Sequence, residues 1–224
     1  MSDQKAGKTP KGYKGIAMEG IVAKWYAGNQ KKMMGQYKTW ANKISGELAD
    51  GSSVLEVAPG PGYLAIELAR LGNYRITGLD ISKTFVEIAQ KNANETGVSI
   101  DFRQGDVGHM PFPNETFDFI VCTAAFKNFA EPINALNEMH RVLRANGRAL
   151  IIDLKRDVSK ESIEKEVNDM HLGRLNSLFT KWTFNWLAKQ ARTKNEFTEL
   201  VWKTSFGKCT IQEDAIGLEI RLQK

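Results

Sequence analysis

Short apolar runs alternate with apolar residues at helical spacing between residues 53 and 154. Each run is five to seven residues long, and three of the five end at or just before proline, aspartate or glycine, which predicts strands separated by helices. The predicted strands are Val54–Ala58, Tyr74–Asp80, Val98–Gln104, Phe117–Thr123 and Arg148–Leu154. The predicted helices are Tyr63–Leu71, a helix that Ser82 caps and that runs to about Asn94, and Pro132–Leu143.

This alternation predicts parallel strands joined by right-handed helical crossovers. The stretches 119–121 and 150–152 are apolar at every position, which is typical of strands covered on both faces. We therefore expect a doubly wound α/β sheet with helices on either side.

The periodicity changes on both sides of this core. Lys155–Gln190, rich in aromatic residues, and Lys194–Phe206 have helical spacing. Cys209–Gln212 and Leu218–Leu222 predict a closing antiparallel pair of strands. Met18–Trp40 predicts an amphipathic helix that could cover a site as a lid.

Composition narrows the class of protein. With 42% hydrophobic and 25% charged residues, the chain can bury an ordinary core, and we expect all five of its tryptophans to be buried. The sequence contains no apolar run of the ~18 residues that a membrane span needs, and its polar start does not resemble a secretory signal. Two cysteines indicate free thiols and a cytoplasmic location. The net charge of +5 is spread over scattered lysines, so we do not expect a nucleic-acid partner.

A glycine-rich loop after the first strand is the strongest chemical signal. Gly60 and Gly62 lie between this strand and the first helix, where glycine allows a ligand to approach the backbone. Asp80 ends the next strand, a position that reaches ribose hydroxyls in doubly wound sheets. Glu56 lies within the first strand and can meet a cationic group of a ligand.

The same glycine spacing also fits a dinucleotide fingerprint, with Asp80 as its acidic partner. Pro59 and Pro61 do not favour a dinucleotide-binding loop, because they remove two backbone donors from the loop that would hold a pyrophosphate. Asp106 follows the third strand at the same edge and can accept from an adenine amino group.

Five stretches together carry a resemblance to a family. They are 55–62, 77–82, 104–107, 110–118 and 138–147, read in that order. Over residues 53–154, the sequence resembles the class I S-adenosylmethionine-dependent methyltransferases, in particular their small-molecule, quinone-biosynthesis branch (methyltransferase type 11).

The resemblance implies a Rossmann-like seven-stranded sheet, mostly parallel with an antiparallel last strand, and S-adenosylmethionine as cofactor. Residues 1–224 would form one domain: a helical lid (1–45), a cofactor-binding core (46–155), a helical insertion (156–207) and a closing hairpin (208–224). The implied cofactor residues are Glu56, Ala58, Gly60, Gly62, Asp80, Ile81, Asp106, Val107, Cys122 and Thr123.

A catalytic residue is harder to assign. The family often carries a histidine near Lys127, which this chain lacks, so Lys127 and His171 are only weak candidates, and a surface salt bridge is an equal reading of Lys127. We expect His109 to be an ordinary loop residue and His140 to be exposed. We expect no metal site.

The resulting hypothesis is direct displacement of the cofactor's methyl group by an O, N, S or C atom of a small, apolar or aromatic acceptor. Three alternatives remain: an NAD-dependent oxidoreductase, a cofactor-binding protein without turnover, and an RNA or protein methyltransferase. The aromatic stretch 179–186 is read equally as an acceptor pocket or as core packing, and a membrane-surface role ranks below both. The sequence does not indicate an oligomeric state.

Overall fold

A computed structural model describes residues 12–14, 18–169 and 173–224. Its centre is a seven-stranded sheet in the order β3-β2-β1-β4-β5-β7-β6. Every pairing among β1 to β5 is parallel, and β7 runs antiparallel to both β5 and β6. The predicted fold, including the antiparallel last strand, is therefore confirmed.

Each strand lies close to its predicted position. The strands are β1 (Ser53–Val57), β2 (Arg75–Asp80), β3 (Asp101–Gln104), β4 (Phe117–Thr123), β5 (Leu143–Leu154), β6 (Thr210–Glu213) and β7 (Gly217–Gln223). The chain leaves β1 toward β2 and β3 on one side and returns to β4 and β5 on the other. The adjacent ends of β1 and β4 thus form the switch point at which doubly wound sheets bind ligands.

Two apolar layers cover the sheet. One face packs against α2 (Met34–Ser45), α3 (Tyr63–Ala69) and α4 (Lys83–Thr96). The other face packs against α5 (Pro132–Val142) and α8 (Lys194–Trp202). Neighbouring residues of β4 alternate between the layers, with Ile120 in one cluster and Phe119 in the other, so this strand is buried on both faces, as predicted.

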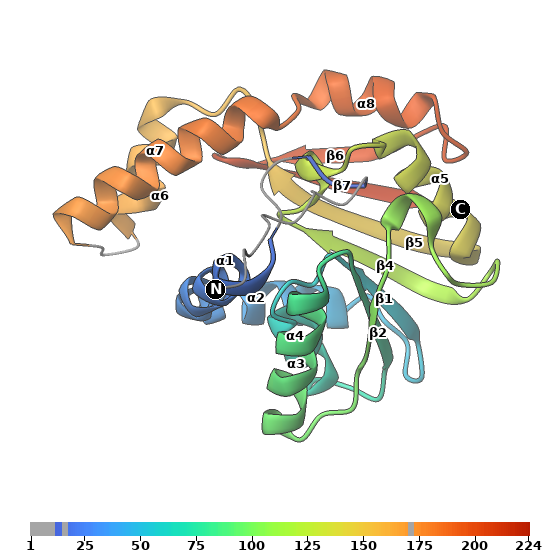
Figure 1. The fold of residues 1–224 in the computed structure, drawn as a ribbon. Coiled ribbons are helices and arrows are strands. Elements are labelled where there is room, and N and C mark those ends of the chain that lie inside the picture. Colours follow the sequence, from blue (N-terminus) through green and yellow to red (C-terminus); the bar gives the residue numbers. More distant parts are fainter. Residues whose placement is uncertain (1–11, 15–17, 170–172) are drawn as a thin grey trace, which may run out of the picture.

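The remaining helices lie outside these layers. α1 (Gly20–Gln30) precedes α2 through a short 3-10 helix, η1 (Lys31–Met33), and contacts α4. α6 (Lys160–Asp169) and α7 (Arg174–Gln190) pack against each other and project at the left of the view, above α1 and α2 (Figure 1). The predicted lid and insertion are therefore separate helical units beside the carboxyl ends of the strands.

Several predicted boundaries were wrong by a few residues for local reasons. The predicted helix from Lys155 begins only at Lys160, because Lys155 forms a bridge with Arg192. The third strand begins at Asp101 rather than Val98, because only its last four residues pair with β2. The structure also shows a longer β5, which begins at Leu143 rather than Arg148 and contains Asn146 in a left-handed conformation (φ 64°).

Candidate functional site

The loop after β1 is shaped by residues with positive φ. Ala58 (φ 54°) turns the chain and donates its N–H to the Leu79 carbonyl at 2.8 Å. Gly62 (φ 78°) needs to be glycine because a Cβ there would lie 2.8 Å from Cζ of Phe102. Gly60 (φ 54°) has no atom within 4 Å of its would-be Cβ. At Gly62, internal packing is by itself sufficient to require glycine, and the approach of a ligand to both glycines stays a prediction.

Asp80 ties this loop to the next helix. Its side chain is buried, one carboxylate oxygen accepts from the Gly60 N–H at 3.0 Å, and the other accepts from the Ser82 N–H at 2.9 Å. Burial raises the pKa of Asp80 to about 6, against the opposing effect of these hydrogen bonds. The two oxygens keep further lone pairs, so Asp80 can still accept from ligand hydroxyls.

Glu56 lies deeper, within β1, and is almost fully buried. Its Oε2 accepts from the Ala65 N–H at 2.9 Å, inside the first turns of α3. Burial raises the pKa of Glu56 to about 8, and the charge of Asp80 adds to the rise. Two buried carboxyl groups therefore lie at the ends of neighbouring strands, and among the described residues no basic side chain is hydrogen-bonded to either. This arrangement is suited to a cationic ligand.

The third acid at this edge has a local structural role. Asp106 Oδ1 accepts from the Gly108 N–H at 2.9 Å and caps the 3-10 helix η2 (Val107–His109). Val107 is buried, whereas Ile81 is half-buried and its carbonyl accepts from Gln104 at 3.3 Å. The resemblance assigns the adenine to these residues, and that assignment stays a prediction.

The segment before α1 crosses this edge. Gly12 and Lys14 pair with the loop after β4 through Ala130 N–H to Gly12 carbonyl (3.1 Å) and Lys14 N–H to Asn128 carbonyl (2.7 Å). A Cβ on Gly12 would lie 2.4 Å from Oδ1 of Asp106, so the backbone rests directly on that carboxylate. In this conformation the N-terminal segment covers the side of the site that Asp106 occupies.

A second contact holds the same segment to α4. The Ser82 hydroxyl donates to the Met18 carbonyl at 2.6 Å. The Glu19 carboxylate accepts from the backbone N–H groups of Lys83 and Thr84, both at 3.0 Å. These bonds hold the pKa of Glu19 low, although burial opposes them. The carboxylate therefore caps the first turn of α4, where the helix dipole favours a negative charge.

Tyrosines line the lid side of the site. Burial raises the pKa of Tyr13, and the nearby Asp80 charge adds to it. Burial likewise raises the pKa of Tyr26 to about 12, with Tyr13 and Asp80 among the neighbouring groups. The Tyr37 hydroxyl donates to Gln30 Oε1 at 2.8 Å, and its ring lies 5.7 Å from that of Tyr63.

Sequence reasoning placed Tyr26 and Tyr37 in a lid helix without assigning them to the site, and missed Tyr13 altogether. Tyr13 lies in a short polar stretch with no periodicity, so only its pairing opposite Phe129 reveals its place. The structure thus adds aromatic and hydroxyl groups to the carboxylates that the motifs indicated.

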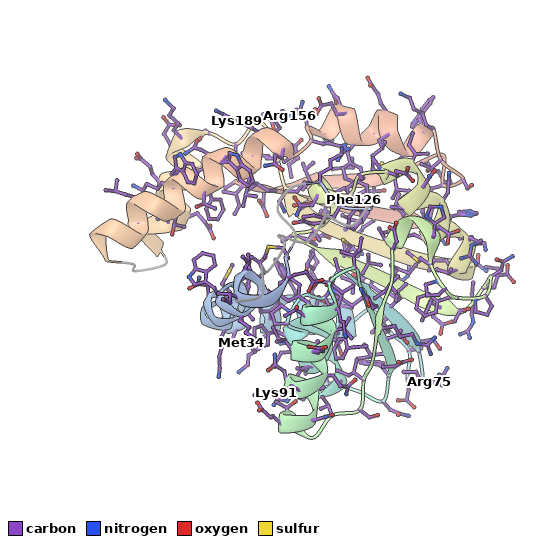
Figure 2. The ribbon with its side chains drawn as sticks, viewed as in Figure 1. Met34, Arg75, Lys91, Phe126, Arg156 and Lys189 are labelled. Atoms are coloured by element: carbon purple, nitrogen blue, oxygen red, sulfur yellow. The ribbon has the colours of Figure 1, made fainter. Side chains whose placement is uncertain are left out.

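Lys127 forms a buried ion pair rather than the surface salt bridge that the sequence suggested. Its Nζ lies 2.9 Å from Oδ1 of Asp153, and its side chain is only 5% exposed. Asp153 Oδ2 also accepts from the Lys127 backbone N–H at 2.8 Å. Phe126, the preceding residue, lies in the interior below α8 (Figure 2). With its ammonium group bound to Asp153 and to the Ala124 carbonyl, Lys127 has an evident structural role.

The other candidates are dispersed. The Cys122 side chain is fully buried in the core, where burial raises its thiol pKa, while Thr123 is half-buried at the end of β4. His171 lies outside the described residues. His109 is exposed, and it ends the 3-10 helix η2 rather than lying in a loop as expected. His140 was expected to be exposed but is half-buried, with its ring 5.0 Å from Phe206.

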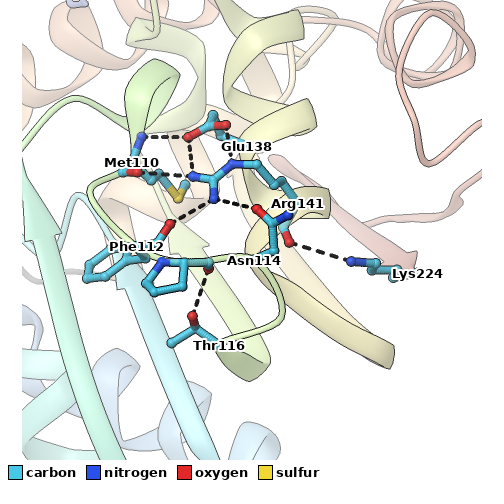
Figure 3. A network of polar contacts seen from close by, with 8 residues as sticks. Met110, Phe112, Asn114, Thr116, Glu138, Arg141 and Lys224 are labelled. Atoms are coloured by element: carbon cyan, nitrogen blue, oxygen red, sulfur yellow. Dashed lines mark hydrogen bonds and ion pairs between the residues drawn. The ribbon is translucent and has the colours of Figure 1, made fainter.

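Two of the motifs behind the resemblance prove to be structural. Arg141 donates to both carboxylate oxygens of Glu138 (2.6 and 2.7 Å) and to the carbonyls of Met110 (3.0 Å) and Phe112 (2.7 Å) (Figure 3). Glu138 in turn accepts from the Met110 N–H at 2.7 Å. This clamp fixes the loop that follows Asp106 against α5 and thereby positions the edge of the site.

The described residues contain no group of three or more His, Cys, Asp and Glu that could hold a metal ion. What they bring together is two buried carboxyl groups, an open glycine, a third acid and several tyrosines at the switch point of the sheet. Such a site can bind a ligand that combines a cationic group with hydroxyls.

Comparison with known proteins agrees with this geometry. A family profile described as "Methyltransferase domain" matches residues 55–151. The ubiquinone/menaquinone biosynthesis C-methyltransferase UbiE of Bdellovibrio bacteriovorus is 34% identical over 139 residues, which is 59% of this chain and 58% of that protein. A demethylmenaquinone methyltransferase of Deinococcus radiodurans is 34% identical over 56% of this chain and 53% of its own length. The chain thus spans between half and three fifths of these relatives.

Solved structures show the same fold. A putative S-adenosyl-L-methionine-dependent methyltransferase from Methanococcus maripaludis superposes with a TM-score of 0.71 at 23% identity, over 100% of this chain and 97% of that one. A methyltransferase from Aquifex aeolicus gives a TM-score of 0.63 at 18% identity, over 82% and 88%. The match to the Methanococcus maripaludis structure covers the helices on both sides of the core as well as the core itself.

Proposed function

We propose, from the premise that residues 55–151 are a class I S-adenosylmethionine-dependent methyltransferase domain, that this chain transfers a methyl group to a small molecule. The observation that carries the proposal is the meeting of Glu56, Gly60 and Asp80 at the ends of β1 and β2. When bound, S-adenosylmethionine supplies a methyl group already activated by the sulfonium charge, so that positioning provides most of the rate.

The donor set fits this cofactor. Asp80 would hold the ribose hydroxyls, and the open side of Gly60 leaves room for the ligand. Glu56 would face the cationic methionyl part, with its charged form stabilised by the ligand's ammonium group. Asp106, Val107 and Ile81 would border the adenine, where the N-terminal backbone now rests, so we expect the segment at Gly12 to shift when the cofactor binds.

Ala58, Gly62, Cys122 and Thr123 would shape the methionyl side. Of these, Cys122 would act only through its backbone, because its side chain is enclosed in the core. Lys127 would position the loop after β4 through Asp153 rather than take part in the chemistry.

We assign the acceptor to the class of small apolar or aromatic molecules. The relatives named above are, by name, ubiquinone/menaquinone biosynthesis and demethylmenaquinone methyltransferases, and tyrosines line the lid side of this site. A quinone-like ring is therefore the first acceptor to test. We propose that the enzyme acts in the cytoplasm.

The deciding experiment is calorimetric titration of the purified chain with S-adenosylmethionine, S-adenosylhomocysteine and NAD, beside the variant Asp80→Ala. We expect micromolar binding of the first two ligands, none of NAD, and about a 100-fold weaker affinity in the variant, since two hydrogen-bonding oxygens are lost from a buried site. Binding of NAD alone would overturn the proposal.

Matched controls separate cofactor binding from turnover. Asp106→Asn keeps the cap on η2 and should reduce affinity less than Asp80→Ala. Methyl transfer to a panel of quinones and phenols, followed with a labelled methyl group, tests the acceptor class. Tight cofactor binding without transfer to any acceptor would instead favour a binding protein without turnover.

A further inference from the structure

Four of the five tryptophans are exposed, contrary to the expectation that all would be buried. On α1, Trp25 is 59% exposed and Ile21 is 84% exposed. On α7, Leu178, Trp182 and Trp186 are between 46% and 67% exposed. These five residues are called the tryptophan surface below.

The exposed residues follow the helical repeat. Leu178, Trp182 and Trp186 are spaced four residues apart and so lie along one side of α7. Ile21 and Trp25 have the same spacing on α1, whose other side buries Ala23 and Ala27. Both helices lie at the same side of the molecule, to the left of the sheet (Figure 1). Apolar rows of this size on a surface commonly mark an interaction site.

The charge of these segments has one sign. Residues 20–45 contain five lysines, and residues 174–190 contain one arginine and two lysines. Together they hold eight of the chain's 31 basic residues and none of its 26 acidic ones. Lys24, next to Trp25 in the sequence, and Lys31, at the start of η1, are both exposed, and Lys189 is exposed near the end of α7 (Figure 2). By contrast, α6 has mixed charge, with Lys160 and Lys165 exposed as well as Glu161 and Glu164.

We propose that the tryptophan surface docks on an anionic lipid bilayer. Tryptophan prefers the zone between lipid headgroups and acyl chains, and flanking lysines are attracted to anionic headgroups. A second copy of this chain would meet the same surface with the same positive charge, which opposes self-association. The chain would lie on the bilayer rather than span it, since none of the helices in the described ranges is long and apolar enough to cross.

The test is co-sedimentation with lipid vesicles, because it does not depend on methyl transfer and can therefore fail separately from the proposed function. Vesicles of phosphatidylcholine alone are compared with vesicles that also contain about 30% phosphatidylglycerol. The variants are Trp182→Ser with Trp186→Ser, and Trp25→Ser. The matched control is Trp202→Ser, since Trp202 is 73% exposed on α8, a helix that also carries Glu196 and Glu199.

We expect wild type and Trp202→Ser to bind the anionic vesicles equally and to bind neutral ones weakly. The double variant should lose about tenfold in partition coefficient, and raised salt should weaken binding of the wild type. Charge reversal by Lys24→Glu with Lys189→Glu should give a similar loss without removing any aromatic ring. Circular dichroism verifies that each variant is folded.

Three results would overturn the proposal. One is absence of binding to anionic vesicles, and another is an equal loss in Trp202→Ser and the double variant. The third is a dimer in sedimentation velocity that the double variant abolishes, which would make the tryptophan surface a contact between copies.

Discussion

At the carboxyl edge of the sheet, charged side chains are buried, whereas on α1 and α7 large apolar side chains are exposed. Glu56, Asp80 and Lys127 are each under 10% exposed, and Trp25 and Trp182 are each more than half exposed. Both regions depart from the usual partition of residues between core and surface, in opposite directions. Buried ionisable groups and exposed large apolar side chains both lower the stability of the folded chain, and they are expected at ligand-binding or partner-binding sites.

The two departures are tolerated for different reasons. At the edge, each of these buried ionisable groups has a partner: Asp80 and Glu56 accept backbone N–H groups, and Lys127 pairs with Asp153. On the helices, Trp25 and Trp182 keep more than half of their side-chain surface in water, so little of that surface contributes to the core. Substitutions should therefore affect folding strongly at the edge and weakly on the helices.

Lys127→Met should have the largest effect on stability. It leaves Asp153 buried without its cation, which typically costs about 3–5 kcal/mol. Urea unfolding measures this loss. The control Lys91→Met breaks only the exposed pair between Lys91 and Glu95 (3.7 Å) and should change stability by less than about 0.5 kcal/mol. Equal effects of the two variants would contradict the structural role given to Lys127.

Gly62→Ala should cause the second largest loss of stability. A Cβ there would meet Phe102 at 2.8 Å and Ala89 at 2.9 Å, on a backbone with φ of 78°. Overpacking and backbone strain together should cost about 3 kcal/mol in thermal or urea unfolding. Gly60→Ala isolates the strain, since nothing lies within 4 Å of its new Cβ, and should cost about 1 kcal/mol. A smaller loss at Gly62 than at Gly60 would refute the packing argument.

Stability should fall as the pH rises from about 5 to 8, because the folded chain holds protons that the unfolded chain releases. The pKa of Glu56 is raised to about 8 and that of Asp80 to about 6. The stabilisation of the folded state by their bound protons is therefore complete at low pH and is lost as the pH rises through this window. Glu56→Gln should flatten the slope by up to about 1 kcal/mol per pH unit. Urea midpoints of both proteins across the window measure it, and an unchanged slope would count against an ionisable Glu56.

Trp182→Ser should have the smallest effect, within about 0.5 kcal/mol of wild-type stability, because the side chain is mostly in water. By contrast, Phe119→Ala empties a fully buried position and should cost about 3–5 kcal/mol. Urea unfolding of these two variants compares the free energy of unfolding lost at an exposed and at a buried aromatic residue. A large loss in Trp182→Ser would show that α7 packs its tryptophans inward in solution.

The core of the fold was predictable because its signals are local. Apolar runs such as 119–121 identify buried strands, and the glycine loop with Asp80 identifies the switch point. The predicted places of Glu56, Gly60 and Asp80 at one edge follow from parallel topology alone, and the structure puts them there. Their roles toward a cofactor stay predictions.

Other features depended on contacts between distant segments. Nothing near Tyr13 in the sequence places it by Asp80, and nothing near Lys127 shows that Asp153 will meet it in the interior. Exposure of Trp25 and Trp182 was also missed, because composition favours buried tryptophan and helical spacing does not say which face a neighbour covers.

Local patterns were enough to predict the order of strands and helices, the doubly wound sheet and the acids at its carboxyl edge, because periodicity and turn residues act within a few positions of the chain. Packing between distant segments sets which ionisable groups are buried, which tyrosines approach the carboxylates and which aromatic residues stay in water. Those properties depend on what packs against each side chain, and residues far apart in the sequence supply those neighbours.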